Sequence, residues 1–364
     1  MRTSLSRAKW RLSPHLFFAA VGLGMLLVVS VAAAMPGAVK PQTLATRGPV
    51  LALAGDGDRA ALLVGSRGAC ASVVVWEPSR GRIVRLHSAT RGECVEGQPV
   101  TRAVALAGTR VAWLQAGGGN TLETTVATAT LARPTPVSVA LALSTSGMGD
   151  FARRPLGDGT LLAFTVDRRC SEGEDANPPC PPGSKTGDVV AATVWRAAGS
   201  GRCPNSYSLV RRCSRVSKAD GELSVLAVDA GRIAVRTDSG VRLLTATGRV
   251  LQDFAVKARA VALSGNRLAV RRAGVVEVYD TASGELTAQF PAAPSLRLED
   301  LDGSILVTAS GRMVTLRRLG DGRMRTIRTA GIAHAQLERP GLFVAAGRRV
   351  TFTPMRDVLR RLEP

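Results

Sequence analysis

The sequence has few of the side chains on which catalysis and metal binding usually depend. It holds three histidines and six cysteines in 364 residues, and aromatic residues make up only 4%. A Ser-His-Asp triad would have to use one of these histidines, and no G-x-S-x-G segment presents a nucleophilic serine. The cysteines lack the close C-x-x-C pairs that are typical of zinc sites. These gaps lead us to expect no metal and no cofactor.

Lysine is also scarce, because only five of the 48 basic residues are lysines and the other 43 are arginines. The net charge of +20 would suit a nucleic acid or another anionic partner. The arginines are spread along the whole chain, however, and few aromatic rings accompany them to stack on bases. We interpret the charge as a compositional bias with a solvated basic surface. This interpretation disfavours nucleic acid and leaves open an acidic cell-wall polymer or a lipid surface.

The longest apolar run lies near the N-terminus. Residues 16–34 are almost entirely apolar, follow four basic residues within the first eleven, and end in three alanines. A basic segment, an apolar stretch and small residues are the signature of a secretory signal. The run of 19 residues is also just long enough to cross a bilayer. We expect residues 1–34 to be a signal peptide or an N-terminal membrane anchor helix, residues 35–47 to be a linker, and the protein to be secreted or extracytoplasmic.

The six cysteines all follow this apolar run, and an even number in an oxidising compartment indicates disulfides. They are Cys70, Cys94, Cys170, Cys180, Cys203 and Cys213. In the repeat described next, the topology places Cys70 and Cys94 on the same face of one unit, so we predict that these two are joined. The other four allow three pairings, of which we favour Cys170–Cys180 and Cys203–Cys213.

A strand, a Gly-containing turn and a second strand recur along the chain. The clearest copies span residues 261–270, 225–235 and 104–113, and looser copies begin near residues 50, 157, 298 and 335. Third and fourth short strands usually follow, as in residues 274–290. Four short strands repeated every ~40–45 residues are typical of a β-propeller. We predict an all-β, seven-bladed propeller of four-stranded antiparallel blades over residues 48–364, with the small apolar residues of the first strands filling its channel.

Two parts of the chain depart from the repeat. Residues 168–219 are longer than the neighbouring units require, hold four cysteines and several prolines, and are predicted to be an insertion. We interpret it as a stapled surface loop, or alternatively as a binding loop. The last unit lacks an obvious fourth strand. We predict that either residues 42–46 or the charged tail at residues 357–362 completes it and closes the ring.

Residues 276–286 read Val-Glu-Val-Tyr-Asp-Thr-Ala-Ser-Gly-Glu-Leu. This segment resembles the repeat of the YVTN/WD40-like family of bacterial β-propellers, whose units read val-x-val-tyr/ile-asp-thr-x-x-gly-x-val. The resemblance implies the propeller fold over most of residues 48–360 and implies no particular activity. The Gly-His and Trp-Asp dipeptides of true WD40 repeats are absent, and so is the repeated tryptophan of quinoprotein propellers.

His334 is the sole catalytic candidate, because it lies on the first strand of the last unit, near the channel, whereas His87 belongs to the outer part of the first unit. We predict a monomeric, non-enzymatic binding or scaffold module outside the cytoplasm, with an unidentified protein or a cell-surface polymer as its partner. The alternative is an extracytoplasmic hydrolase or lyase with its site in the channel. A cluster of polar side chains on the channel-facing strands would discriminate between the two.

Overall fold

The computed structural model describes residues 40–65, 71–88, 100–118, 121–145, 148–173, 178–203 and 209–363. All of these belong to one compact unit, Val39–Pro364. The expected signal or anchor segment, residues 1–34, therefore lies outside the described residues. Within the described residues, no helix has the length and apolar character that crossing a membrane requires.

The described chain is built mainly of short strands, and five of its sheets have four antiparallel strands each. In four of these sheets each strand pairs with the next strand along the chain. The sheets are β2 (Val50–Asp56), β3 (Arg59–Gly65), β4 (Ala71–Glu77) and β5 (Arg82–Ser88); β15 (Leu223–Asp229), β16 (Arg232–Thr237), β17 (Gly240–Thr245) and β18 (Val250–Phe254); β19 (Ala260–Ser264), β20 (Arg267–Arg271), β21 (Val275–Asp280) and β22 (Leu286–Pro291); and β23 (Arg297–Asp302), β24 (Ile305–Ser310), β25 (Met313–Arg318) and β26 (Met324–Arg328).

The fifth four-stranded sheet joins the two ends of the described chain. It consists of β27 (Ala333–Glu338), β28 (Gly341–Ala346), β29 (Arg349–Pro354) and, at its edge, β1 (Gln42–Ala45). Gln42 lies opposite Phe352, and Leu44 lies opposite Val350. Of the two segments predicted to complete the last unit, the structure selects the N-terminal one, so residues 42–45 are a strand and not part of a linker. The tail instead forms the helix α1 (Met355–Arg361), whose Val358 is buried.

The remaining sheet is larger because two groups of strands pair with each other. One group is β6 (Val100–Ala107), β7 (Arg110–Gly117), β8 (Thr121–Thr130) and β9 (Val137–Thr145), and the other is β10 (Met148–Ala152), β11 (Leu156–Asp158), β12 (Leu161–Arg169), β13 (Val189–Cys203) and β14 (Leu209–Ala219). β9 pairs with both β10 and β14. The predicted insertion at residues 168–219 is thus corrected in part: most of it is the strand pair β13–β14, and residues 170–188 are the loop.

The apolar runs in the sequence form the second strand of each sheet. β3 and β28 are buried along almost their whole length, because a neighbouring sheet covers each of their two faces. A separate apolar cluster fills each space between consecutive sheets. One such cluster joins Trp76 of the first sheet to Phe343 and Phe352 of the last, with the Trp76 and Phe343 ring centroids 6.1 Å apart. The apolar clusters therefore follow one another from sheet to sheet, and the last sheet packs against the first.

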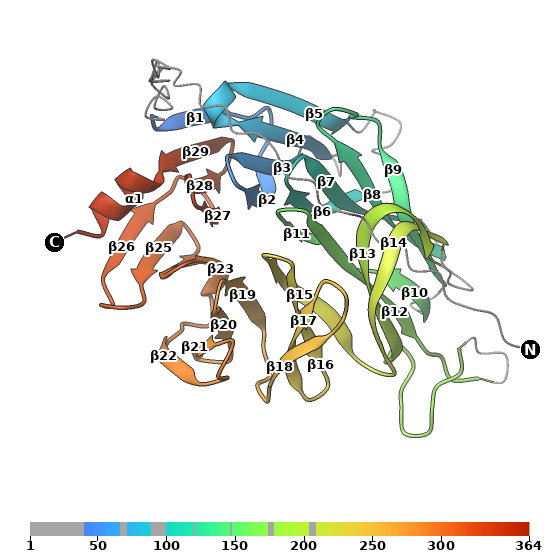
Figure 1. Cartoon of the computed structure of the whole chain (residues 1–364). Coiled ribbons are helices and arrows are strands. Elements are labelled where there is room, and N and C mark those ends of the chain that lie inside the picture. The colour runs from blue at the N-terminus through green and yellow to red at the C-terminus, as the bar shows by residue number, and fades with distance from the viewer. Residues whose placement is uncertain are drawn as a thin grey trace, which may run out of the picture. The chain divides into compact units, whose positions relative to one another are not determined.

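The innermost strands, here called the first strands, surround a common centre (Figure 1). They are β2, β6, β11, β15, β19, β23 and β27. Each of them contacts the next one, and β27 contacts β2. Because the last first strand meets the first one, the sheets of the unit Val39–Pro364 form a closed ring.

Hydrogen bonds between consecutive turns connect the first strands. A side chain at or near the end of one first strand accepts a hydrogen bond from a backbone N–H of the following hairpin. The N–H donors and their acceptors are Gly57 to Glu338 (3.1 Å), Gly108 to Asp56, Ala230 to Asp158 (2.7 Å), Gly265 to Asp229 (3.0 Å), Gly303 to Ser264 (3.0 Å) and Leu337 to Asp300 (2.7 Å). The Asp-Gly pairs that predict turns thus have a second role, because their carboxylates also link neighbouring sheets.

Several of these turn carboxylates are buried, and burial raises the pKa values of Asp158, Asp300 and Glu338. Burial, together with the Asp300 and Asp56 carboxylates, raises the pKa of Glu338 to about 9. Burial raises the pKa of Asp300 to about 7, although the N–H groups of Leu337 and Leu301 oppose this shift. Burial and the neighbouring Asp56 and Asp229 likewise raise the pKa of Asp158. The folded protein therefore holds protons here that an unfolded chain would release.

Replacing Leu44 by proline should unfold the ring cooperatively. Proline lacks the N–H that a strand contributes to its ladder, so β1 would lose part of its pairing with β29. We expect one calorimetric transition at a clearly lower temperature, since each sheet depends on both of its neighbours. Leu44→Ala is the control that removes the side chain and keeps the N–H. An unchanged melting transition in Leu44→Pro would show that β1 does not close the ring.

The melting temperature should fall as the pH rises from about 5 to 9. Ordinary carboxyl pKa values lie near 4, whereas those of Asp300 and Glu338 are about 7 and 9. Between these limits the folded state binds more protons than the unfolded state, so the free energy of unfolding decreases with rising pH. Glu338→Gln keeps an acceptor for the Gly57 N–H. It should reduce the fall in melting temperature at pH 9 by roughly 3–6 °C. Glu285→Gln, at an exposed position, should leave the pH profile unchanged.

Candidate functional site

A cavity of about 750 Å³ occupies the centre of the ring and is lined mainly by the first strands. A volume of this size lies within the range of pockets that bind ligands. Small apolar residues such as Ala54 and Ala105 do line it, as the sequence predicts. They do not fill it, however, so the expectation of a packed channel is wrong.

Bulges in the first strands determine which side chains face the cavity. The register of pairing shifts around Leu51 in β2, Arg102 in β6, Leu226 in β15 and Glu299 in β23. A β-bulge adds one residue to a strand and re-aims its side chain. All four of these residues line the cavity. The same local distortion, repeated in four sheets, therefore builds this lining.

A fifth first strand is interrupted where the others bulge. β10 and β11 both pair with β12, and the residues between them are Arg153, Arg154 and Pro155. Proline has no N–H for the ladder, which favours a break at this point. Arg154 lines the cavity, and so does Arg259, which directly precedes β19. We call Leu51, Arg102, Arg154, Leu226, Arg259 and Glu299 the channel ring.

The channel ring lies three to five residues before the end of each first strand. At a rise of about 3.3 Å per residue, roughly 10–16 Å separates it from the last residues of these strands, among them Asp56 and Asp158. The ring arginines thus line the cavity together with Glu299 and Asp300, while Asp56 and Asp158 lie at the turns beyond its lining. This separation of charge favours an anionic group at the level of the ring.

Some of the arginines around the cavity already have acceptors. The Nε of Arg297 donates to Glu299 (2.7 Å), and Arg271 donates to the carbonyl oxygens of Ala293 and Pro294 (both 2.9 Å). Arg236 donates to Glu222 (3.2 Å) and to the carbonyl oxygen of Ala258 (3.1 Å). These three side chains hold neighbouring segments together, so they have a structural role.

Arg102, Arg154 and Arg259 are different, because none of the described residues accepts a hydrogen bond or forms an ion pair with their side chains. All three side chains have solvent-accessible surface in the channel. Partial desolvation by the sheets around the cavity lowers the pKa of Arg154, Glu299 opposes the shift, and the cation of Arg236 adds to it. The pKa of arginine is so high that Arg154 keeps its charge. The ring therefore holds three cations whose donors remain available to a ligand.

A second cavity of about 680 Å³ adjoins the first and shares Arg102 and Arg154 with it. Its other cations have acidic partners, since Arg153 and Arg169 share Asp167 and Arg236 pairs with Glu222. The guanidinium of Arg169 also lies 5.1 Å from the centroid of the Phe151 ring. We call this cavity the side groove. It extends the channel ring sideways with arginines that are already engaged.

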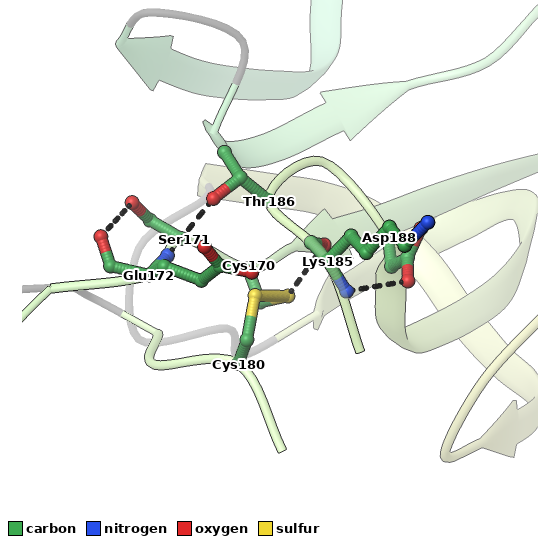
Figure 2. The surroundings of a disulfide bond; sticks show 7 residues. All are labelled: Cys170, Ser171, Glu172, Cys180, Lys185, Thr186 and Asp188. Atoms are coloured by element: carbon green, nitrogen blue, oxygen red, sulfur yellow. Dashed lines mark hydrogen bonds between the residues drawn. A yellow bond between two sulfur atoms is a disulfide. The ribbon is translucent and has the colours of Figure 1, made fainter. Parts of the chain in front are cut away.

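The loop of residues 170–188 starts and ends at the side groove, because Arg169 and Val189 both line that groove. The loop is stapled by the Cys170–Cys180 disulfide, whose Cα atoms lie 4.8 Å apart. Around it, the N–H of Glu172 donates to Thr186 Oγ1 (3.0 Å), and the N–H of Lys185 donates to Asp188 (2.8 Å) (Figure 2). The disulfide and these bonds hold the loop as one piece beside the groove.

The structure places His334 in β27 at the edge of the cavity, as the sequence predicts. Its Nδ1 lies 3.9 Å from an oxygen of Glu299. Burial lowers the pKa of His334, and Glu299 opposes this shift. The described cavity lining contains no serine, threonine, cysteine, lysine or tyrosine that could act as a nucleophile. No group of three His, Cys, Asp or Glu side chains able to hold a metal occurs among the described residues.

The structure describes the predicted disulfide cysteines only in part. Cys170 and Cys180 are joined, in agreement with the favoured pairing. Cys203 and Cys213 lie at the end of β13 and within β14, and Cys213 is opposite Ala197 in the ladder. Cys70 and Cys94 lie outside the described residues.

Peptide mapping of the unreduced protein should recover Cys70 linked to Cys94 and Cys170 linked to Cys180. The first link is expected because the loop between the second and third strands and the segment after the fourth lie at the same face of a sheet. Reduction before digestion should separate both pairs, which is the control for accidental comigration. Recovery of Cys70 joined to any cysteine of residues 170–213 would contradict the prediction.

Comparisons with known proteins show the fold. No protein-family model and no curated protein sequence matches the chain, whereas 543 chains of solved structures match its structure. A chain of the mitotic checkpoint complex matches with a TM-score of 0.52 and 12% identity, over 87% of this chain and 95% of that one. Sqt1 of Saccharomyces cerevisiae matches with a TM-score of 0.46 and 10% identity, over 87% and 98%. The mitotic checkpoint chain is a WD40 β-propeller protein, and at this identity the match shows a WD40-like β-propeller fold alone.

Proposed function

We propose that this protein is an exported, non-enzymatic binding module that engages a protein partner at the channel ring. The observation that carries the proposal is the set of three arginines at the central cavity whose side chains have no acceptor among the described residues. Guanidinium groups with available donors form strong, charge-assisted hydrogen bonds with an anionic ligand. The rigid ring fixes their spacing in advance, which lowers the entropy lost on binding.

The proposal includes a propeller of seven blades. The large sheet counts as two blades, since β6–β9 and the group β10–β14 each contribute their own first strand to the ring. Each of the apolar clusters lies between two consecutive blades. The pairing of β9 with β10 and β14 is then an additional contact across one of these junctions.

Two features support export. Residues 1–34 have the composition of a secretory signal or membrane anchor. The Cys170–Cys180 disulfide is of a kind that persists in oxidising compartments and is rare in the cytosol. Both features are independent of the fold.

A binding role fits the cavity better than catalysis does. Arginine donates hydrogen bonds to anions and almost never gives up its proton, so it suits recognition more than proton transfer. The alternative, a hydrolase or lyase, would rest on His334 beside Glu299 at 3.9 Å. The described lining offers such an enzyme no serine, threonine, cysteine, lysine or tyrosine as its nucleophile.

Site-specific photo-crosslinking in the native cells should locate the binding face. A photoreactive residue in place of Leu51, which is 49% exposed in the channel ring, should capture a discrete protein. The same residue in place of Leu286, 48% exposed on the outer strand β22, is the matched control and should capture little. The captured product should be found outside the cytoplasm. Equal capture from both positions, or capture only of cytoplasmic proteins, would contradict the proposal.

A further inference from the structure

The channel ring also indicates the chemistry of its ligand. We propose that it binds an acidic peptide segment that carries both carboxylates and aliphatic side chains. This inference rests on the proposed binding function and specifies what the partner presents. Its basis is the composition of the ring, which combines three available arginines with two leucines.

The three available guanidinium groups define the anionic part of the ligand. Arg102 and Arg154 come from neighbouring first strands, and Arg259 comes from a strand two positions further along the ring. Planar guanidinium groups pair bidentately with carboxylates, so three of them suit several carboxylates spaced along one segment. Glu299 already accepts a hydrogen bond from Arg297, so it accepts none from the three arginines of the ring.

The leucines of the ring define the apolar part. Leu51 and Leu226 occupy bulge positions that are equivalent to that of Arg102. Leu51 stays 49% exposed, although it lies at the wall of a cavity. An aliphatic side chain from a ligand would remove this leucine from water, which favours binding. A polyphosphate or a nucleic acid backbone has no such side chain, and the described lining has no phenylalanine, tyrosine or tryptophan to stack on a base.

The side groove gives the segment a path out of the ring. Its cations Arg153 and Arg169 are already paired with Asp167, so it attracts acidic chains less than the ring does. Phe151 and Leu122 line it and would accept apolar residues. The other end of the channel, where Asp56 accepts the Gly108 N–H, would repel carboxylates. The peptide would therefore bind at the ring and leave through the groove, and would not pass through the channel.

The proposal can be tested with peptides of defined chemistry. The probe is a short, fluorescein-labelled peptide of alternating Glu and Leu, measured by fluorescence anisotropy, with an alternating Gln-Leu peptide and inorganic polyphosphate as comparisons. The test variant is Arg102→Gln, Arg154→Gln and Arg259→Gln combined. The control variant, Arg249→Gln, Arg325→Gln and Arg328→Gln combined, changes the net charge equally at exposed positions on β26 and beside β18. Both variants should be checked for an unchanged melting transition.

We expect the Glu-Leu peptide to bind the native protein at least about tenfold more tightly than either comparison, and the test variant to lose at least about tenfold in affinity. The control variant should bind as the native protein does, and raising the salt concentration should weaken binding. Equal losses in the two variants would mean that only net charge matters, and tighter binding of polyphosphate would mean a different anion; either result overturns the inference. If the test variant binds normally while Leu51 still crosslinks a protein, the ligand chemistry is wrong and the binding module stands.

Discussion

The hydrogen bond from a hairpin N–H to a carboxylate or hydroxyl of the preceding sheet is the interaction on which the ring depends. A tight turn between two strands exposes N–H groups that its own ladder cannot satisfy. In this protein Gly57, with a φ of +58°, makes such a turn, and Glu338 of the last sheet accepts its N–H. The bond fixes the position of one sheet against the next at the level of the turns. It also requires acidic side chains at one end of the channel.

One junction lacks this bond. β6 ends in Ala107, which has no acceptor to offer to the turn that follows β11. The backbones approach closely instead, and a Cβ on Gly108 would lie only 2.9 Å from the carbonyl oxygen of Gly159. The same junction is the one at which β9 pairs with β10 and β14. The additional ladder therefore stabilises the junction where the side-chain bond is missing.

The architecture could be predicted from the sequence, and the lining of the cavity could not. Residues 261–270 become β19 and β20 with the turn at Gly265, because apolar runs around a glycine specify a hairpin almost by themselves. The strands β13 and β14 were not predicted. Register shifts near Trp195 and Arg202 disturb the alternation of apolar and polar residues by which a strand is recognised. The same effect concealed Arg102 and Glu299. A bulge moves one side chain to the other face of the strand, and the sequence pattern contains no sign of it.

The pairing of β1 with β29 has a consequence for the order in which the chain folds. Gln42 and Phe352 are paired, so β1 has no partner strand until about 300 further residues have been synthesised. During that time it must not pair with an exposed outer strand such as β22 or β26. Its sequence, Gln-Thr-Leu-Ala, is short and only weakly apolar, and Lys40 and Arg47 flank it. Charges beside a short strand act as gatekeepers against premature pairing. The pairing that closes this ring thus depends on a segment whose composition disfavours pairing with a wrong strand.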